Sequence, residues 1–337
     1  MPQTYGAGTR ATPVVGLERE RRLRVPLLSD RILGRATRVM LVIAVLSTVA
    51  IAVYALRDRF FTSSESLPQH ETQRLEKIIS DEPDNLQARI ALGNAYIADG
   101  RYQEAIDQLN QAMELSQDGN QRGVLMGLAF AYLGAGDRGQ ATDYFTQVAE
   151  ASEGGGAIAR DRVMETAYYY LGKLALEDGR ADEAVDLLKK AVTVERSDSD
   201  ALYLLGKAFE AQGDYVQAVE AYKVALGFVP DYREAYEGLA RAYEAQAQPE
   251  RAEYARAMIT LFTGDPASAA ANLQAVAASV TDDADIFWGL GLAYEESGQR
   301  DKAVEAYEQA LALRDDHMLA RDALQRLSRK PQEGGQP

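Results

Sequence analysis

The sequence predicts an all-α protein, in which a solenoid of helix-turn-helix repeats follows one N-terminal transmembrane helix. Three observations carry this prediction. An uncharged run occupies residues 39–56, glycines recur with a period of about 34 through the rest of the chain, and small residues lie at fixed distances from those glycines. A repeat of this period is typical of stacked helical hairpins, because one hairpin cannot bury its apolar face without a neighbour.

The first two segments of the chain are a basic tail and an apolar run. Residues 1–38 contain eight arginines and three acidic residues, although the whole chain carries a net charge of −15. The run at 39–56, VMLVIAVLSTVAIAVYAL, would span roughly 27 Å as a helix, close to the ~30 Å of a bilayer core. We predict a single transmembrane helix, with residues 1–38 in the cytoplasm because arginine accumulates on that side. A linker at 57–67 would then lead to repeats outside the cytoplasm.

Other interpretations of the N-terminal segments remain open. A cleaved signal peptide could end at the AIA sequence of residues 50–52, but the basic leader is longer than a signal peptide allows and the apolar run continues past that point. The arginines of the leader could contact anionic lipids, although fixing the topology would be sufficient to explain them. We expect no nucleic-acid binding, since the leader has no interleaved aromatic residues.

Glycines and alanines keep a constant register from residue 93 onward. Seven positions before five of the turn glycines the sequence has a small residue, and five positions after each it has alanine. The turn glycines are Gly100, Gly136, Gly179, Gly213, Gly264 and Gly298. We predict that the small residues mark the points where two helices cross closely, and that large residues between them fill the remaining space.

This register resembles that of the tetratricopeptide repeat family. The five clearest matches are LGNAYIADGRYQEAIDQLNQAMEL, LAFAYLGAGDRGQATDYFTQVAE, LGKLALEDGRADEAVDLLKKAVTV, LGKAFEAQGDYVQAVEAYKVAL and LGLAYEESGQRDKAVEAYEQALAL. The resemblance implies a right-handed superhelix that binds polypeptides. With a capping helix at each end, this solenoid would occupy residues 68–328 and leave a disordered tail at 329–337.

The repeat spacing is broken at two places, by an insertion at residues 153–162 and by a half period farther on. Ala247 takes the place of a turn glycine and lies only half a period before Gly264. The helix between them would have to serve as the second helix of one hairpin and the first helix of the next. We predict one unpaired helix at this point, which would change the local curvature or divide the array into two lobes.

A stripe of polar side chains is the candidate binding groove. The resemblance places the first helix of each hairpin on the concave surface, and basic residues recur there once in every repeat period. The candidate groove residues are Tyr169, Lys173, Tyr203, Lys207, Glu237 and Arg241. These residues would bind an extended or acidic peptide by charge-assisted hydrogen bonds and tyrosine contacts.

The alternative for this stripe is local ion pairing along each helix. Lys173 would pair with Glu177, Lys207 with Glu210, and Arg241 with Glu237 or Glu244. The carboxylate clamp of some chaperone-binding family members is not expected, because the first repeat has Ile90 and Asn94 at the corresponding places.

Several other polar and aromatic residues have a structural interpretation. His70 and His317 are expected as solvated residues at helix ends. The acidic pairs Asp282–Asp283 and Asp315–Asp316 lack the spacing of a calcium loop and are expected to cap helices. Trp288 is either a groove anchor or a core residue.

No constellation of catalytic residues is present in the sequence. The chain has no cysteine, no phosphate-binding glycine loop, no dinucleotide fingerprint and no nucleophile elbow. We therefore expect that this protein is not an enzyme and that it has no catalytic residue, no cofactor and no metal site. The predicted function is that of a membrane-tethered scaffold or chaperone-like adaptor for protein partners. The alternative is a regulatory or assembly subunit of one membrane complex, for example in cytochrome maturation or protein export.

Overall fold

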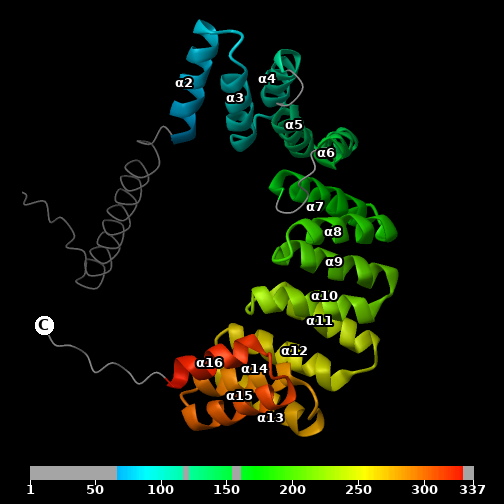
Figure 1. Ribbon diagram of the computed structural model, residues 1–337, viewed down its shortest axis with the longest axis vertical. Helices are drawn as coiled ribbons and strands as arrows, with labels where there is room; N and C mark the ends of the chain where they lie inside the picture. The colour runs from blue at the N-terminus through cyan, green and yellow to red at the C-terminus, as the bar shows by residue number, and fades with distance from the viewer. Residues whose placement is uncertain (1–66, 117–120, 154–160, 329–337) are drawn as a thin grey trace, which may run out of the picture. The chain divides into compact units, whose positions relative to one another are not determined.

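All regular structure in the described residues is α-helical. The computed structural model describes residues 67–116, 121–153 and 161–328, and in these ranges each helix packs on the next one along the chain (Figure 1). The fifteen helices of these ranges are α2 (Leu67–Asp81), α3 (Leu86–Ala98), α4 (Tyr102–Leu115), α5 (Gln121–Ala135), α6 (Arg138–Glu153), α7 (Arg162–Glu177), α8 (Ala181–Val194), α9 (Ser199–Gln212), α10 (Tyr215–Phe228), α11 (Arg233–Ala245), α12 (Pro249–Phe262), α13 (Pro266–Ser279), α14 (Ala284–Glu296), α15 (Arg300–Leu313) and α16 (Met318–Ser328). The predicted helical solenoid is confirmed.

Four of the predicted segments fall outside this description, wholly or in most of their length. These are the basic tail at 1–38, the transmembrane helix at 39–56, the linker at 57–67 and the tail at 329–337. Of the helices within the described ranges, none is long and apolar enough to cross a membrane. The tail, anchor and linker therefore stay predictions from the sequence.

Two kinds of turn join the helices where the structure describes the whole connection. Between the helices of a hairpin one residue is left-handed, as at Gly213 with φ of +80°, and the amides of Gly213 and Asp214 donate to the carbonyls of Glu210 and Phe209, both at 2.9 Å. Between the hairpins α7–α8 and α9–α10 the chain is extended at Glu195, and Asp198 caps the following helix. The turn type therefore shows which helices form a hairpin.

Glycine on the first helices makes room for large side chains on the second helices. A Cβ at Gly206 of α9 would lie 2.5 Å from the ring of Tyr222 on α10, and a Cβ at Gly238 of α11 would lie 2.4 Å from the same ring. The Tyr222 side chain is fully buried between them, and the alanines at Ala218 and Ala225 are also fully buried. The prediction that small residues mark close helix crossings is confirmed.

Helix α12 belongs to two hairpins. The turns on both of its sides are of the left-handed kind, with φ of +55° at Ala247 and +96° at Gly264. Up to this point the odd-numbered first helices touch each other, as α9 and α11 do, whereas beyond it α12 touches α14. This confirms the prediction of one helix that serves as the second helix of one hairpin and the first helix of the next. As a result, the first helices that touch one another are odd-numbered before α12 and even-numbered from α12 onward. A left-handed alanine costs about 1 kcal/mol relative to glycine, which the packing of both hairpins outweighs.

The two ends of the stack are closed by single helices. On α2, Leu75 and Ile79 pack against the core of the first hairpin. On α16, Ala320, Ala323 and Leu327 are buried against the last hairpin. Each cap gives an otherwise open apolar face a partner, as helical arrays require.

Candidate binding pocket

The six residues of the candidate groove lie on three first helices that touch in sequence order. They are Tyr169 and Lys173 on α7, Tyr203 and Lys207 on α9, and Glu237 and Arg241 on α11. The three helices that carry the predicted row therefore touch one another, and the binding role of the row stays a prediction. Burial raises the pKa of the half-buried Tyr169 hydroxyl to about 12, so that this tyrosine stays neutral at physiological pH.

The lysines of this row lie over aromatic rings. The ammonium of Lys207 is 5.7 Å from the ring centroid of Tyr203, and that of Lys173 is 5.9 Å from the ring centroid of Tyr170. The local pairing predicted as the alternative is wrong in its partners. Glu177 pairs with Arg138, while Glu237 pairs with Arg233 at 3.0 Å.

Arg241 takes part in a contact that holds three helices together. Its guanidinium donates to both carboxylate oxygens of Glu210 at 3.1 Å, and the hydroxyl of Tyr222 donates to the same carboxylate. We call this contact the Tyr-Glu-Arg staple. The staple recurs near the end of the stack with Tyr307, Glu295 and Arg326. Arg241 is thus held by a repeated structural contact between α9, α10 and α11.

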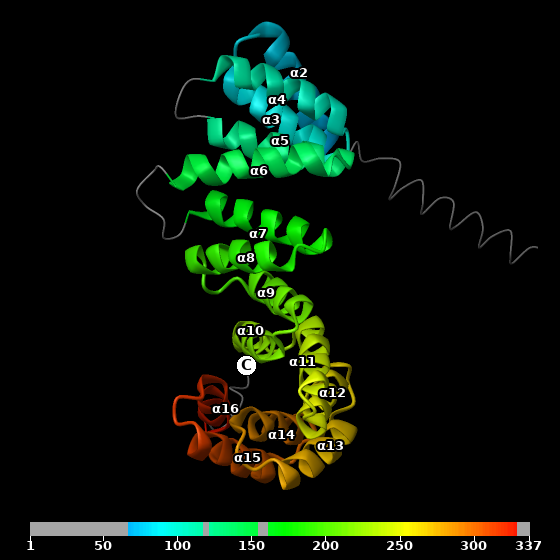
Figure 2. The ribbon, with the colours of Figure 1, turned by 90° about the vertical axis from the view of Figure 1, so that its right-hand side faces the viewer.

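A cavity lies in the C-terminal part of the stack, around helix α12, where the contacting row of helices changes from odd to even numbers. It has a volume of about 700 Å³, which is within the range of ligand pockets, and we call it the C-terminal pocket. Figure 2 shows the helices that surround it, α10, α11, α12, α14 and α16. The turn between α15 and α16 closes one side. None of the six predicted groove residues lines this cavity.

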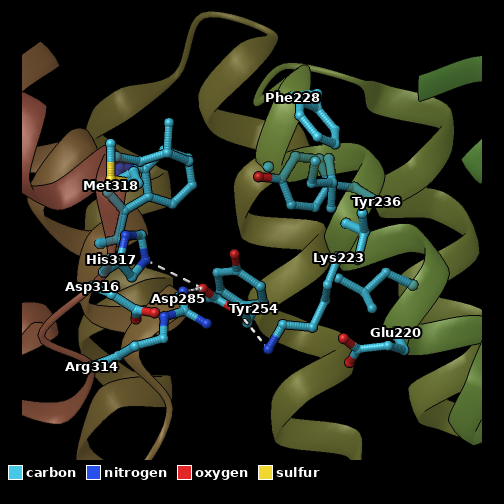
Figure 3. A pocket seen from close by; sticks show the side chains of 16 residues that line it. Glu220, Lys223, Phe228, Tyr236, Tyr254, Asp285, Arg314, Asp316, His317 and Met318 are labelled. Atoms are coloured by element: carbon cyan, nitrogen blue, oxygen red, sulfur yellow. Dashed lines mark hydrogen bonds and ion pairs between the residues drawn. The ribbon is translucent and has the colours of Figure 1, made fainter. Parts of the chain in front are cut away.

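Large apolar side chains stand exposed at the rim of the C-terminal pocket. Phe228 at the end of α10 is 51% exposed, and Met318 at the start of α16 is 60% exposed. Figure 3 shows these two residues on facing walls, from segments that lie far apart in the sequence. Exposed apolar residues gathered at a cavity are typical of an interaction site.

The floor of the C-terminal pocket is a partly buried ionic cluster centred on Asp285 of α14. Its carboxylate lies 2.5 Å from the ammonium of Lys223 on α10, pairs with Arg314, and lies 3.3 Å from Nε2 of His317 (Figure 3). Burial alone would raise the pKa of Asp285, but the contacts with His317, Lys223 and Arg314 outweigh it and hold that pKa well below its usual range. Burial likewise opposes the charge on Lys223, yet the nearby carboxylates of Asp285 and Asp283 raise its pKa.

His317 is a structural residue of this cluster. The prediction of a solvated histidine is wrong, because His317 is only 4% exposed. Its Nδ1 accepts the amide proton of Ala320 at 3.3 Å and so caps α16, in place of the aspartates predicted for this task. With Nδ1 as acceptor, the ring proton is assigned to Nε2, which faces the carboxylate of Asp285.

Trp288 forms part of the pocket wall. Its side chain is 6% exposed, and its ring centroid lies 6.1 Å from that of His317. The two predicted roles of this residue therefore coincide in part, since the ring is packed in the core and also borders the cavity.

The capping prediction for Asp283 is confirmed, because it accepts the amide of Asp285 at 3.1 Å. Within the described ranges no three acidic, histidine or cysteine side chains converge as a metal site would require.

Sequence reasoning missed the C-terminal pocket because its key contact does not follow the repeat. Lys223 and Asp285 are far apart in the sequence and lie on α10 and α14, which are not neighbours along the chain. The half-period spacing from Ala247 to Gly264 was the one sequence signal nearby, and it predicted the shift but not the residues that meet across it. Lys223 by itself looks like an ordinary surface lysine of a second helix.

Three stretches of the chain match models of tetratricopeptide repeats. They are residues 72–123, residues 126–233 in two overlapping matches, and residues 284–317. Over 95 residues the chain is 32% identical to the photosystem I assembly protein Ycf3 of Rippkaea orientalis. The matched stretch covers 28% of this chain and 54% of that protein. The chain thus spans about half the length of this curated relative.

Solved structures support the fold. The C-terminal part of a tetratricopeptide-repeat protein from Cytophaga hutchinsonii matches 75% of this chain and 93% of its own length, with a TM-score of 0.50 and 16% identity. A structure of MamA covers 53% of this chain and 96% of its own, with 21% identity and a TM-score of 0.44, too low to support an argument. From the matching stretches and the helical stack together, this chain contains tetratricopeptide repeats.

Proposed function

We propose that this protein is a scaffold, tethered to a membrane, that binds polypeptide partners in the C-terminal pocket. The observation that carries the proposal is the cavity itself, with Phe228 and Met318 exposed on facing walls beside the ionic cluster of Asp285. Aromatic residues and methionine are enriched in the cores of protein interfaces. The proposal assigns no catalysis to the chain.

The ionic floor supports binding by fixing the shape of the empty pocket. Asp285 on α14 connects Lys223 of α10 with Arg314 and His317 beside α16, so the facing walls are joined before any partner arrives. A site held in its binding form loses less conformational entropy when the partner binds. We therefore expect the pocket to act as a rigid receptor for a segment of its partner.

A cross-linking experiment in cells tests this proposal. A photo-reactive phenylalanine analogue would replace Phe228 or Met318, and in a matched control it would replace Val216, which is 65% exposed on α10 but does not line the pocket. We expect specific protein adducts from the two pocket positions, which mass spectrometry would identify. Absence of adducts at both positions, or the same adducts at Val216, would contradict the proposal.

The candidate groove on α7, α9 and α11 is a second binding surface in this proposal. Lys173 and Lys207 lie over tyrosine rings, where they could receive an acidic partner segment. Charge reversal of Lys173, Lys207 and Arg241 together should weaken partner binding if this surface contributes. Unchanged affinity in that variant would leave the C-terminal pocket as the single proposed site.

The tether is proposed from the sequence of residues outside the described ranges. The uncharged run at 39–56 and the arginines of residues 1–38 support an anchor with a cytoplasmic N-terminus and extracytoplasmic repeats. A tether raises the local concentration of the repeats near membrane partners. Protease added to spheroplasts should digest the repeats from outside. Protection until the membrane is broken would reverse the proposed orientation.

A role in the assembly of one membrane complex is the second candidate function. The relative from Rippkaea orientalis is called a photosystem I assembly protein, and the match to 95 residues of this chain is the observation in favour. Such a subunit should co-purify with one integral membrane protein in a fixed ratio. A scaffold or chaperone-like adaptor should instead yield adducts with several partners in the cross-linking experiment.

A further inference from the structure

We infer that the C-terminal pocket selects a polypeptide segment in which a large apolar side chain lies next to lysine or arginine. This inference rests on the proposed function and adds the chemistry of the partner. The inference depends on a difference between the charges around the pocket. The cations have ion-pair partners within the protein, whereas the acidic residues at the rim have none among the residues that the structure describes.

The cations of the pocket already have carboxylate partners within the protein. Lys223 and Arg314 both pair with Asp285, and the ammonium of Lys223 also lies 3.9 Å from Asp283. Taking either cation from this cluster for an incoming carboxylate would leave Asp285, which is largely buried, with fewer of its partners. An acidic partner would therefore compete with the protein's own ion pairs.

The acidic residues at the rim are not neutralised in this way. Glu220 on α10 and Asp316 before α16 are both exposed lining residues, and neither has an ion pair with any residue that the structure describes. Figure 3 shows them on opposite sides of the pocket, with the cluster around Asp285 between them. A cation entering from the rim can approach either carboxylate without breaking an existing contact.

The apolar walls supply the other half of the recognition. Phe228 and Met318 form the exposed rim, and the buried Trp288 also lines the pocket. An apolar side chain inserted here would be flanked by Glu220 and Asp316, so the neighbouring residues of the partner would meet negative charge. The net charge of −15 on the whole chain steers basic segments toward it and repels acidic ones.

Selection from a random peptide library tests the inference directly. Dodecapeptides displayed on phage would be selected on the full-length chain at low salt, where rim charges act most strongly. We expect enriched sequences that combine leucine, phenylalanine or tryptophan with an adjacent lysine or arginine. Enrichment of acidic or uncharged sequences would overturn this inference and leave polypeptide binding intact. Absence of any enrichment would count against the proposed function as well.

Charge-neutral variants then locate the selected peptide. In the double variant Glu220→Gln/Asp316→Asn we expect the best synthetic peptide to bind about tenfold more weakly at low salt, and this difference should shrink as salt is raised. The control is Asp186→Asn/Glu308→Gln, which removes the same charge from exposed sites on α8 and α15 that do not line the pocket. Equal losses in the two double variants would reduce the effect to net charge and overturn the inference. Cross-links at Phe228 that join two copies of this chain would make a second copy the occupant and would also overturn it.

Discussion

The ionic contacts before and after α12 differ in how they relate to the repeat. The staple of Tyr222, Glu210 and Arg241 joins neighbouring helices, and its equivalent recurs on α14, α15 and α16 with Tyr307, Glu295 and Arg326. The cluster of Lys223 and Asp285 joins helices that are not neighbours along the chain, and it has no counterpart at the same register in the described hairpins before α12. Contacts that recur with the repeat hold the stack together, whereas the contact that departs from it marks the proposed site.

The largest effect is expected when the non-repeating cluster is broken. Asp285→Asn would leave Lys223 largely buried without its main counter-charge, and we expect the free energy of unfolding to fall by about 3 kcal/mol. Urea denaturation followed by circular dichroism measures this loss. The control Asp282→Asn changes a carboxylate whose side chain is 79% exposed and should alter stability by less than about 0.5 kcal/mol. Similar losses in both variants would remove the distinction between the cluster and ordinary surface pairs.

A close helix crossing should rank next. Gly206→Ala would place a Cβ 2.5 Å from the ring of Tyr222, and we expect a loss of about 2 kcal/mol because the buried ring has little room to move. Gly123→Ala is the matched control, since no atom lies within 4 Å of the added methyl and alanine is the better helix former. The same urea experiment compares the two. A stable Gly206→Ala protein would show that the crossing tolerates a side chain.

An acidic contact in the regular part of the stack should make stability depend on pH. Burial first, and then the neighbouring Asp198, raise the pKa of Glu165 to about 7. A carboxyl group with a raised folded-state pKa favours folding below its unfolded pKa, and this contribution is lost as the pH rises from about 4.5 through about 7.

Glu165→Gln should therefore reduce the loss of stability between pH 5 and pH 8. The change should be smaller than that at Gly206, because the Glu165 side chain is only partly buried and solvent screens its charge. Urea midpoints of the wild type and the variant at the two pH values give the comparison. Parallel pH profiles for the two proteins would contradict a shifted pKa at Glu165.

The smallest effects are expected in the two staples. Arg241→Met and Arg326→Met each remove an exposed guanidinium from a glutamate, and each should cost about 0.5 kcal/mol. Because the staples share one geometry, the two losses should be similar and should add in the double variant. Calorimetric melting of the three variants measures this. A strong loss of partner binding in Arg241→Met, without a matching loss in Arg326→Met, would return Arg241 to the predicted groove.

The sequence predicted the parts of the molecule that obey the repeat. The register positions of Gly206, Gly213 and Ala218 recur in the other hairpins with small residues or turn glycines. Their spacing was therefore sufficient to predict the turns, the helix crossings and the shared helix α12. The partners of Arg241 and the pairing of Lys223 with Asp285 could not be predicted, because they depend on how one hairpin sits on another. A long side chain reaches several positions on a neighbouring helix, and one sequence does not say which of them it contacts.

Hydrogen exchange of the full-length chain, with and without the selected peptide, tests the central claim most directly. Binding in the C-terminal pocket should slow amide exchange at 220–228 on α10 and at 314–319 before and within α16, the two segments that carry its facing walls. Protection should be absent from 166–176 and 200–210, which hold the residues of the candidate groove on α7 and α9. Protection confined to those two groove segments would contradict the claim that partners bind where the repeat is interrupted.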